Sequence, residues 1–219
     1  GGSWQTVDVS AHVPSGAKAA LVMVINTYSS TAYEGSVRPK TSTLGTAGTI
    51  VGGNFGYMAF VTLDANRQFE AYIGSTSVKI YLLGYVKSGT WYADPESRDK
   101  RPSTTGSWQT VTLSEMTTGG AAVFLNRVSA DTNYGFRKPT SSDSDTSSLE
   151  STNRQSLGIV GTNADKQCQI YAGSTSISML LMGWFESLPA NAPSNVSALG
   201  ESRSTLKVSC GSPYKGEES

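Results

Sequence analysis

Alternating hydrophobic and polar residues predict β-strands along most of this chain. At residues 4–9, Val7 and Val9 share one face opposite polar neighbours, and residues 108–113 repeat the pattern. A period of two with a single apolar face is typical of a half-buried strand. Residues 57–73 predict a hairpin, because two strand-like runs flank an Asp-Ala-Asn-Arg turn. No segment combines a sustained helical period with a capping signal, so we expect no long helix.

The chain contains an internal repeat. Gly-Ser-Trp-Gln-Thr-Val at residues 2–7 returns at residues 106–111, and Gly-Ser-Thr-Ser at residues 74–77 returns at residues 173–176. Further single residues align in the same register, which makes a chance match untenable. Each copy has the size of a small β-sandwich. We therefore predict an all-β protein with two tandem antiparallel β-sandwich domains of jelly-roll-like type.

The repeat divides the chain into four segments. The first β-sandwich repeat spans residues 1–88 and the second spans residues 106–187. Between them, residues 89–105 combine prolines with a dense run of charges, which predicts an exposed linker. We expect residues 188–219 to form an extended tail, in which residues 205–210 have a strand-like pattern. Such a strand could add to an open sheet edge and link subunits, so two tail residues are candidate interface residues: Leu206 and Val208.

Two strand-like segments, residues 78–86 and 177–185, are apolar on both faces. Two hypotheses account for the second face. Either the linker or tail covers it, or it packs on the other repeat or on a neighbouring chain. Gly84 and Gly183 interrupt these strands at matching positions, which indicates a bulge or a close backbone approach. The second face supplies the candidate interface residues: Tyr81, Leu83, Tyr85, Leu180, Met182 and Trp184.

Composition excludes several classes of function. The 219 residues include 17 basic and 17 acidic side chains, so the formal net charge is zero. A nucleic-acid groove or an anionic membrane surface needs a positive excess, and we expect neither partner. No run approaches the roughly 18 apolar residues of a membrane span. Abundant Ser, Thr and Gly favour strands joined by tight turns.

No catalytic or metal-binding constellation is recognisable. His12 has no acid or nucleophile fixed near it in sequence, and carboxylates differ between the repeats, since Glu70 aligns with Gln169. Asp143 and Asp145 begin a polar loop that could bind calcium weakly, but it lacks the glycine and the terminal glutamate of an EF-hand. We therefore expect a protein that is not an enzyme and has no cofactor or metal.

Four residues recur at matching positions and are candidate binding residues: Arg38, Arg137, Tyr72 and Tyr171. Two interpretations stay open for the arginines. Each could cap loop carbonyls or pair with a carboxylate, or each could recognise a partner or a glycan. The tyrosines could stack on sugars, although cross-strand aromatic packing is the commoner role of such residues.

The two cysteines allow two interpretations. Cys168 stands where the first repeat has Phe69, on a row predicted to face inward, so a buried free thiol is expected there. A disulfide between Cys168 and Cys210 would instead tie the tail to the second repeat and imply an oxidising compartment.

Several motifs bound the predicted strands. They are Trp-Gln-Thr-Val-Asp-Val-Ser at residues 4–10, His-Val-Pro-Ser-Gly-Ala at 12–17, Asp-Ala-Asn-Arg-Gln-Phe-Glu-Ala-Tyr-Ile at 64–73 and Tyr-Leu-Leu-Gly-Tyr at 81–85. These motifs resemble β-sandwich modules of bacteriophage and phage-like virion or tail structural proteins. The resemblance covers both repeats but not the tail. It implies a component of a virion or of an extracellular assembly, without catalytic residues.

The sequence thus favours a non-enzymatic structural subunit of a repetitive assembly, located in a virion or outside the cell. Its expected partners are copies of itself or other subunits of a virion or filament. The duplication, the strands that are apolar on both faces and the tail motivate this expectation. The alternative is a carbohydrate-binding or adhesion module, for which surface glycans would be the partners.

Overall fold

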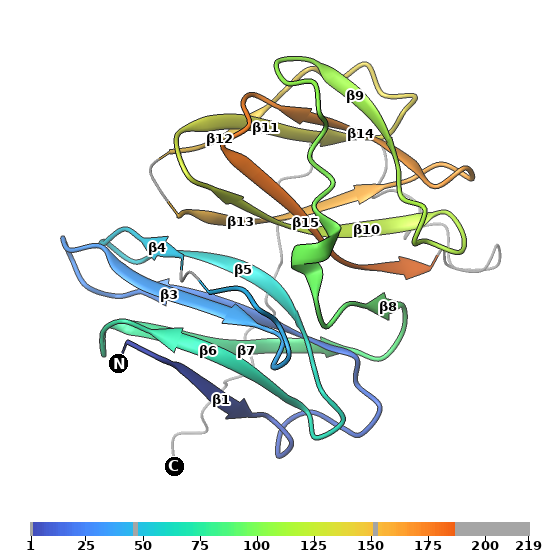
Figure 1. Cartoon of the computed structure of the whole chain (residues 1–219). Coiled ribbons are helices and arrows are strands. Elements are labelled where there is room, and N and C mark those ends of the chain that lie inside the picture. The colour runs from blue at the N-terminus through green and yellow to red at the C-terminus, as the bar shows by residue number, and fades with distance from the viewer. Residues whose placement is uncertain (1, 46–47, 151–152, 187–219) are drawn as a thin grey trace, which may run out of the picture. The chain divides into compact units, whose positions relative to one another are not determined.

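The computed structural model describes residues 2–45, 48–150 and 153–186, which form antiparallel β-sheets and one short 3₁₀ turn (Figure 1). The prediction of an all-β chain is confirmed. Both repeats and the segment between them belong to one compact unit, Gly1–Ser187. The predictions for Leu206, Val208 and Cys210 fall outside the described residues.

The first repeat contains two sheets. The four-stranded sheet has the order β1-β6-β3-β4 and the three-stranded sheet has the order β5-β2-β7. The strands of the first sheet are β1 (Trp4–Asp8), β6 (Gln68–Ile73), β3 (Tyr33–Arg38) and β4 (Thr49–Ile50). Those of the second are β5 (Phe55–Thr62), β2 (Ala19–Asn26) and β7 (Val78–Val86).

The second repeat has the same strand order. Its sheets run β12-β11-β14-β9 and β13-β10-β15-β8, so only β8 lacks a counterpart in the first repeat. The strands of the first sheet are β12 (Ser147–Leu149), β11 (Thr132–Arg137), β14 (Gln167–Ala172) and β9 (Trp108–Thr112). Those of the second are β13 (Gln155–Gly161), β10 (Gly120–Val128), β15 (Ile177–Glu186) and β8 (Thr90–Trp91).

Each repeat encloses its own hydrophobic core between its two sheets. Phe69 on β6 is buried in the first core, and Cys168 occupies the matching position on β14 in the second. The alternation of the strands explains this arrangement, because every second side chain points between the sheets. The two cores make the chain sandwich-like.

The predicted hairpin over residues 57–73 is wrong. β5 pairs with β2, whereas β6 pairs with β1 and β3, so the two strands belong to different sheets. The turn itself forms as expected, because Asp64 Oδ1 accepts hydrogen bonds from the backbone N–H groups of Asn66 at 2.9 Å and Gln68 at 2.8 Å. Turn chemistry reverses the chain, but it does not decide which strands pair.

A β-bulge changes the face of the last residues of β15. Along β10, pairing steps from Gly183 directly to Leu181, so Met182 is the extra residue. The bulge reverses the alternation that follows it. Trp184 therefore belongs to the core of the second repeat rather than to the face of Leu180 and Met182, which corrects its predicted position.

The segment predicted to be an exposed linker lies along the edge of β15. After β8 pairs with this strand, η1 (Pro95–Arg98) forms a short 3₁₀ turn beside it (Figure 1). The Lys100 N–H then donates to the Met179 carbonyl at 2.9 Å, and the Met179 N–H donates to the Asp99 carboxylate at 2.9 Å. Charges and prolines predicted solvent exposure, but the backbone of the segment satisfies the open edge of the sheet.

Candidate functional site

An arginine, a tryptophan and a tyrosine form a cluster in the first repeat. Trp4 on β1 and Tyr72 on β6 are cross-strand partners whose ring centroids lie 5.8 Å apart. The guanidinium carbon of Arg38 lies 4.1 Å from the centroid of the Trp4 ring. Its Nε donates to Glu70 Oε2 at 2.7 Å, and a second N–H donates to the Leu44 carbonyl. The Trp4 ring, the Glu70 carboxylate and the Leu44 carbonyl together stabilise the positively charged guanidinium of Arg38.

The second repeat contains the same cluster with one change. The ring centroids of Trp108 and Tyr171 lie 5.7 Å apart, and the guanidinium carbon of Arg137 lies 4.2 Å from the Trp108 ring centroid. The Arg137 Nε donates to the amide oxygen of Gln169 at 2.6 Å, and another N–H donates to the Asp143 carbonyl. A neutral amide replaces the carboxylate, yet the geometry is retained.

These contacts favour the structural interpretation of the two arginines. Each guanidinium is engaged by groups of its own repeat, and the Arg38 side chain is only 16% exposed. In the first repeat, a hydrogen bond to Glu34 is the main reason that the pKa of the Tyr72 hydroxyl is raised. The structure thus gathers Arg38, Arg137, Tyr72 and Tyr171 into two matching clusters. Their role in binding a partner stays a prediction.

A third hydrophobic cluster joins the two repeats. Phe60 of β5 packs against Trp91 of β8 and Phe185 of β15, with ring centroids 5.1 Å and 5.8 Å away. The predicted interface residues Leu180 and Met182 belong to this cluster and are 4% and 3% exposed. In the second repeat, the first repeat and the linker together cover the second apolar face. The linker, named in one hypothesis, and the other repeat, named in the second, therefore both contribute to covering this face.

Polar contacts flank this junction between the repeats. Ser36 Oγ donates to the Gln155 amide oxygen at 3.1 Å, and Ser42 Oγ donates to Glu96 Oε1 at 2.5 Å. Burial of Glu96 raises the pKa of its carboxyl group, although the Ser42 hydrogen bond opposes this effect. The hydrogen bonds connect the first repeat to both the second repeat and the linker.

The corresponding surface of the first repeat is only partly covered in the part of the chain that the structure describes. Leu21 and Val86 pack against the third cluster, whereas other side chains of this surface stay exposed. Tyr81 and Leu83 on β7 are both 49% exposed, and Met58 on β5 is 37% exposed. Met58 and Tyr81 flank Met23 on β2, with which both pair. We call this surface, formed by Met23, Met58, Tyr81 and Leu83, the bare face. β7 is also the outermost strand of its sheet, so its edge has no neighbouring strand among the described residues.

Tyr85, the remaining predicted interface residue of β7, follows the bulge as Trp184 does. It pairs with Ala20, whose side chain lies in the first core, so its predicted face is corrected in the same way. Trp184 is covered by Tyr92 of the linker, with ring centroids 5.7 Å apart. Tyr85 has no such cover among the described residues and is 44% exposed.

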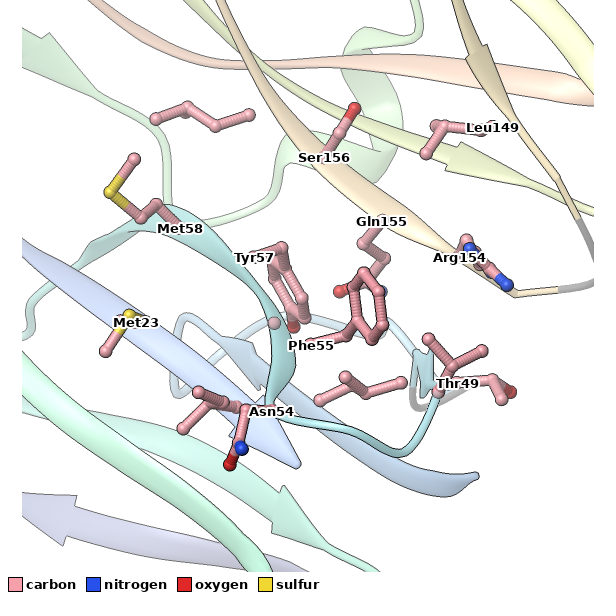
Figure 2. Close-up of a pocket in the computed structure, with 15 residues that line it drawn as sticks. Met23, Thr49, Asn54, Phe55, Tyr57, Met58, Leu149, Arg154, Gln155 and Ser156 are labelled. Atoms are coloured by element: carbon pink, nitrogen blue, oxygen red, sulfur yellow. The ribbon is translucent and has the colours of Figure 1, made fainter. Parts of the chain in front are cut away.

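A cleft of about 580 Å³ lies between β5 and β13, beside the bare face. Figure 2 shows side chains of both strands around it, among them Tyr57 and Met58 from β5 and Gln155 from β13. Burial raises the pKa of Tyr57 strongly, so its hydroxyl is neutral. Within the described part of the chain, the Gln155 Nε2 group lacks a hydrogen-bond partner. Met23 and Met58 line both the cleft and the bare face, so the two adjoin.

Cys168 is fully buried in the second core, and the described residues leave its thiol unbonded. Burial raises the pKa of this thiol to about 12. Cys210 lies outside the described residues, so the Cys168–Cys210 disulfide stays a prediction.

The described residues hold no group of three or more His, Cys, Asp or Glu side chains arranged to bind a metal ion. They also include no helix long and apolar enough to cross a membrane. Asp143, part of the loop considered for calcium, instead receives the Arg137 hydrogen bond on its backbone carbonyl.

Comparison with protein-family models, curated proteins and solved structures finds no match.

Sequence reasoning missed two parts of the site. Trp4 and Trp108 complete the arginine clusters. Each lies in the first strand of its repeat, and a prediction that this strand pairs with the strand of Tyr72 or Tyr171 would have placed the two rings side by side. Phe60 joins the repeats, but its counterpart is Ile159, and nothing in the sequence distinguishes a buried from an exposed member of that pair.

Proposed function

We propose that this protein is a non-enzymatic structural subunit of a repetitive assembly, in which chains associate through the bare face of the first repeat. In this proposal the chain is a tandem pair of jelly-roll-like β-sandwich domains with an extended tail. The assembly is of the kind found in a virion capsid or tail, or in an extracellular filament.

One observation carries the proposal: the two repeats differ in how the same apolar face is covered. Leu180 and Met182 are buried at the internal junction, whereas their counterparts Tyr81 and Leu83 are half exposed beside an open strand edge. Large exposed apolar surfaces and open edges are features that proteins cover through association. A contact with another chain would bury both features at once.

The engaged arginines give the glycan-binding alternative less support. A sugar would have to displace Arg38 from the Trp4 ring and from Glu70 to reach the flat faces of that cluster. The cluster stabilises the sheet as it stands. No second function is therefore proposed.

The test is the molar mass of the full chain as a function of concentration, measured by light scattering after size-exclusion chromatography. We expect the mass to rise above that of one chain with increasing concentration. Leu83→Glu should remain monomeric and folded, because it places an uncompensated charge in the contact while its own site is half exposed.

Thr112→Glu is the matched control, since Thr112 is exposed on β9, in the β12-β11-β14-β9 sheet of the second repeat. It adds the same charge away from the bare face and should associate like the original chain. Equal association of the Leu83→Glu variant and this control would contradict the proposal.

A further inference from the structure

We infer that the cleft between β5 and β13 is a binding site for a small apolar carboxylate, a molecule with one acid group on a hydrocarbon chain or ring. The apolar body of the ligand lies against β5, and its carboxylate faces Arg154 and Gln155, where β13 begins. This site goes beyond the proposed self-association and does not depend on it. All the residues that carry the inference belong to the compact unit formed by both repeats.

The cleft has the size and the lining of a small-molecule site. Its volume of about 580 Å³ lies within the range of roughly 300–1,000 Å³ that is usual for ligand pockets. Apolar side chains form much of its wall, among them Ile50, Phe55, Met58 and Leu149. Phe55 is 61% exposed and Met58 is 37% exposed, so part of this apolar wall is in contact with solvent. An apolar ligand body would remove that surface from water.

The two walls of the cleft are matching segments of the two repeats that carry different side chains. Asn54 and Asn153 begin these segments, and both have a left-handed backbone, with φ values of 64° and 62°. The next residue is Phe55 in the first repeat and Arg154 in the second. Figure 2 shows both side chains at the cleft. One wall is thus aromatic and the other is polar, which suits a ligand with one apolar and one polar end.

Gln155 supplies an amide nitrogen that has no hydrogen-bond acceptor. Its side chain is 6% exposed and lies against Gly48, where a Cβ atom would stand 2.9 Å from the amide carbon. Ser36 Oγ donates to the amide oxygen at 3.1 Å, and this bond assigns the orientation of the amide. The nitrogen therefore faces away from Ser36 and has no acceptor among the described residues. A buried N–H group without an acceptor is destabilising, and a ligand oxygen would relieve that cost.

Arg154 supplies positive charge at the same end of the cleft. It is the one charged residue among the described residues that line the cleft. Its Nε is buried and also has no acceptor in the described part of the chain. Hydrogen bonds between ionised groups are about twice as strong as those between neutral ones. The two unpartnered donors therefore favour a carboxylate, whose two oxygens accept from both, over a neutral or a cationic group.

Both nitrogen atoms are covered by protein atoms, so the carboxylate reaches them only after a side chain of the cleft rotates. Phe55 is free to do so, because more than half of it is exposed. The last torsion of a glutamine side chain has a broad energy minimum, so the Gln155 amide also turns at little cost.

Isothermal titration calorimetry of the full chain with three probes tests the inference. Octanoate combines the apolar chain with the acid group, octanol has the chain alone, and acetate has the acid group alone. We expect octanoate to bind saturably at one site per chain, and octanol to bind at least about 10-fold more weakly. Acetate should show no saturable binding. Equal affinities for octanoate and octanol, or no saturable binding of octanoate, would overturn the inference.

Two substitutions test the polar wall. Arg154→Met removes the charge but keeps a long apolar side chain, so octanoate should bind about 10-fold more weakly while octanol binds as before. Gln155→Glu replaces the amide nitrogen with a second oxygen and should weaken octanoate binding by at least about 10-fold. Lys18→Met removes one positive charge at an exposed site outside the cleft and is the matched control. Octanoate binding that is unchanged in both cleft variants, or equally weakened in the control, contradicts the assigned site.

Methionine methyl NMR locates the ligand without any substitution, and so does not depend on how the variants fold. The chain has five methionines. Met23 and Met58 line the cleft, whereas Met116 and Met179 are buried in the second core and Met182 lies in the cluster that joins the repeats. Saturating octanoate should shift the methyl signals of Met23 and Met58 and leave the other three in place. Absence of shifts at both cleft methionines would overturn the inference.

Discussion

Gly84 and Gly183 occupy the same bulge position in the two repeats, but only Gly183 has an edge strand against it. A Cβ atom on Gly183 would meet the Thr90 backbone and the Trp91 ring, whereas one on Gly84 would meet open space. Gly183→Ala should therefore destabilise the chain by about 1–3 kcal/mol through overpacking. Gly84→Ala should change the free energy of unfolding by no more than about 0.5 kcal/mol. Urea denaturation of both variants measures the difference, and equal losses would contradict the assigned environments.

The arginine clusters predict that a carboxylate partner is dispensable but the arginine is not. Glu70→Gln copies the natural pairing of Arg137 with Gln169, so it should cost no more than about 0.5 kcal/mol. Arg38→Ala removes the contact with Trp4 and the hydrogen bonds to Glu70 and Leu44, and it should cost about 1–2 kcal/mol. Denaturation at neutral pH compares them. A larger loss for Glu70→Gln than for Arg38→Ala would refute this division.

Glu96 predicts a pH-dependent contribution to stability. Burial raises the pKa of its carboxyl group in the folded chain above the ordinary value of 4.5, so folding penalises the charged form. The penalty is fully present above the folded pKa and disappears as the pH falls towards and below 4.5. Glu96→Gln should therefore be more stable than the original chain at pH 7, with the advantage shrinking as the pH falls to 4.5. Denaturation at the two pH values tests this, and a constant difference would show that Glu96 titrates normally.

The buried thiol predicts unusual chemical inertness. With its pKa raised to about 12 and no exposed surface, Cys168 should resist iodoacetamide in the folded chain at pH 8. It should react fully in urea. Mass spectrometry of the labelled protein, with Cys210→Ser to leave one thiol, provides the measurement. Rapid modification under native conditions would contradict the burial of this side chain.

Strand content and the repeat were predictable because both leave local marks in the sequence. The alternation at Val7 and Val9 sets a half-buried strand, and the core position of Phe69 passes to Cys168 in the same register. These features depend on residues close together in the chain or on direct self-similarity.

Pairing between distant segments was not predictable in the same way. The turn at Asp64 formed as expected, yet it leads from one sheet into the other, since local chemistry does not choose a strand's partner. The bulge at Met182 reversed the face of Trp184, and one extra residue leaves no separate mark in the hydrophobic pattern. The charges of the linker predicted solvent exposure, whereas its backbone pairs with the edge of β15. The two repeats share one hydrophobic pattern, but the outer apolar face of β15 is covered and that of β7 is exposed.

Negative-stain electron microscopy of the full chain at micromolar concentrations tests the central claim most directly. We expect regular filaments or closed rings, which the Leu83→Glu variant should not form while Thr112→Glu should. A uniform field of particles the size of a single chain, unchanged when the concentration is raised, would contradict it.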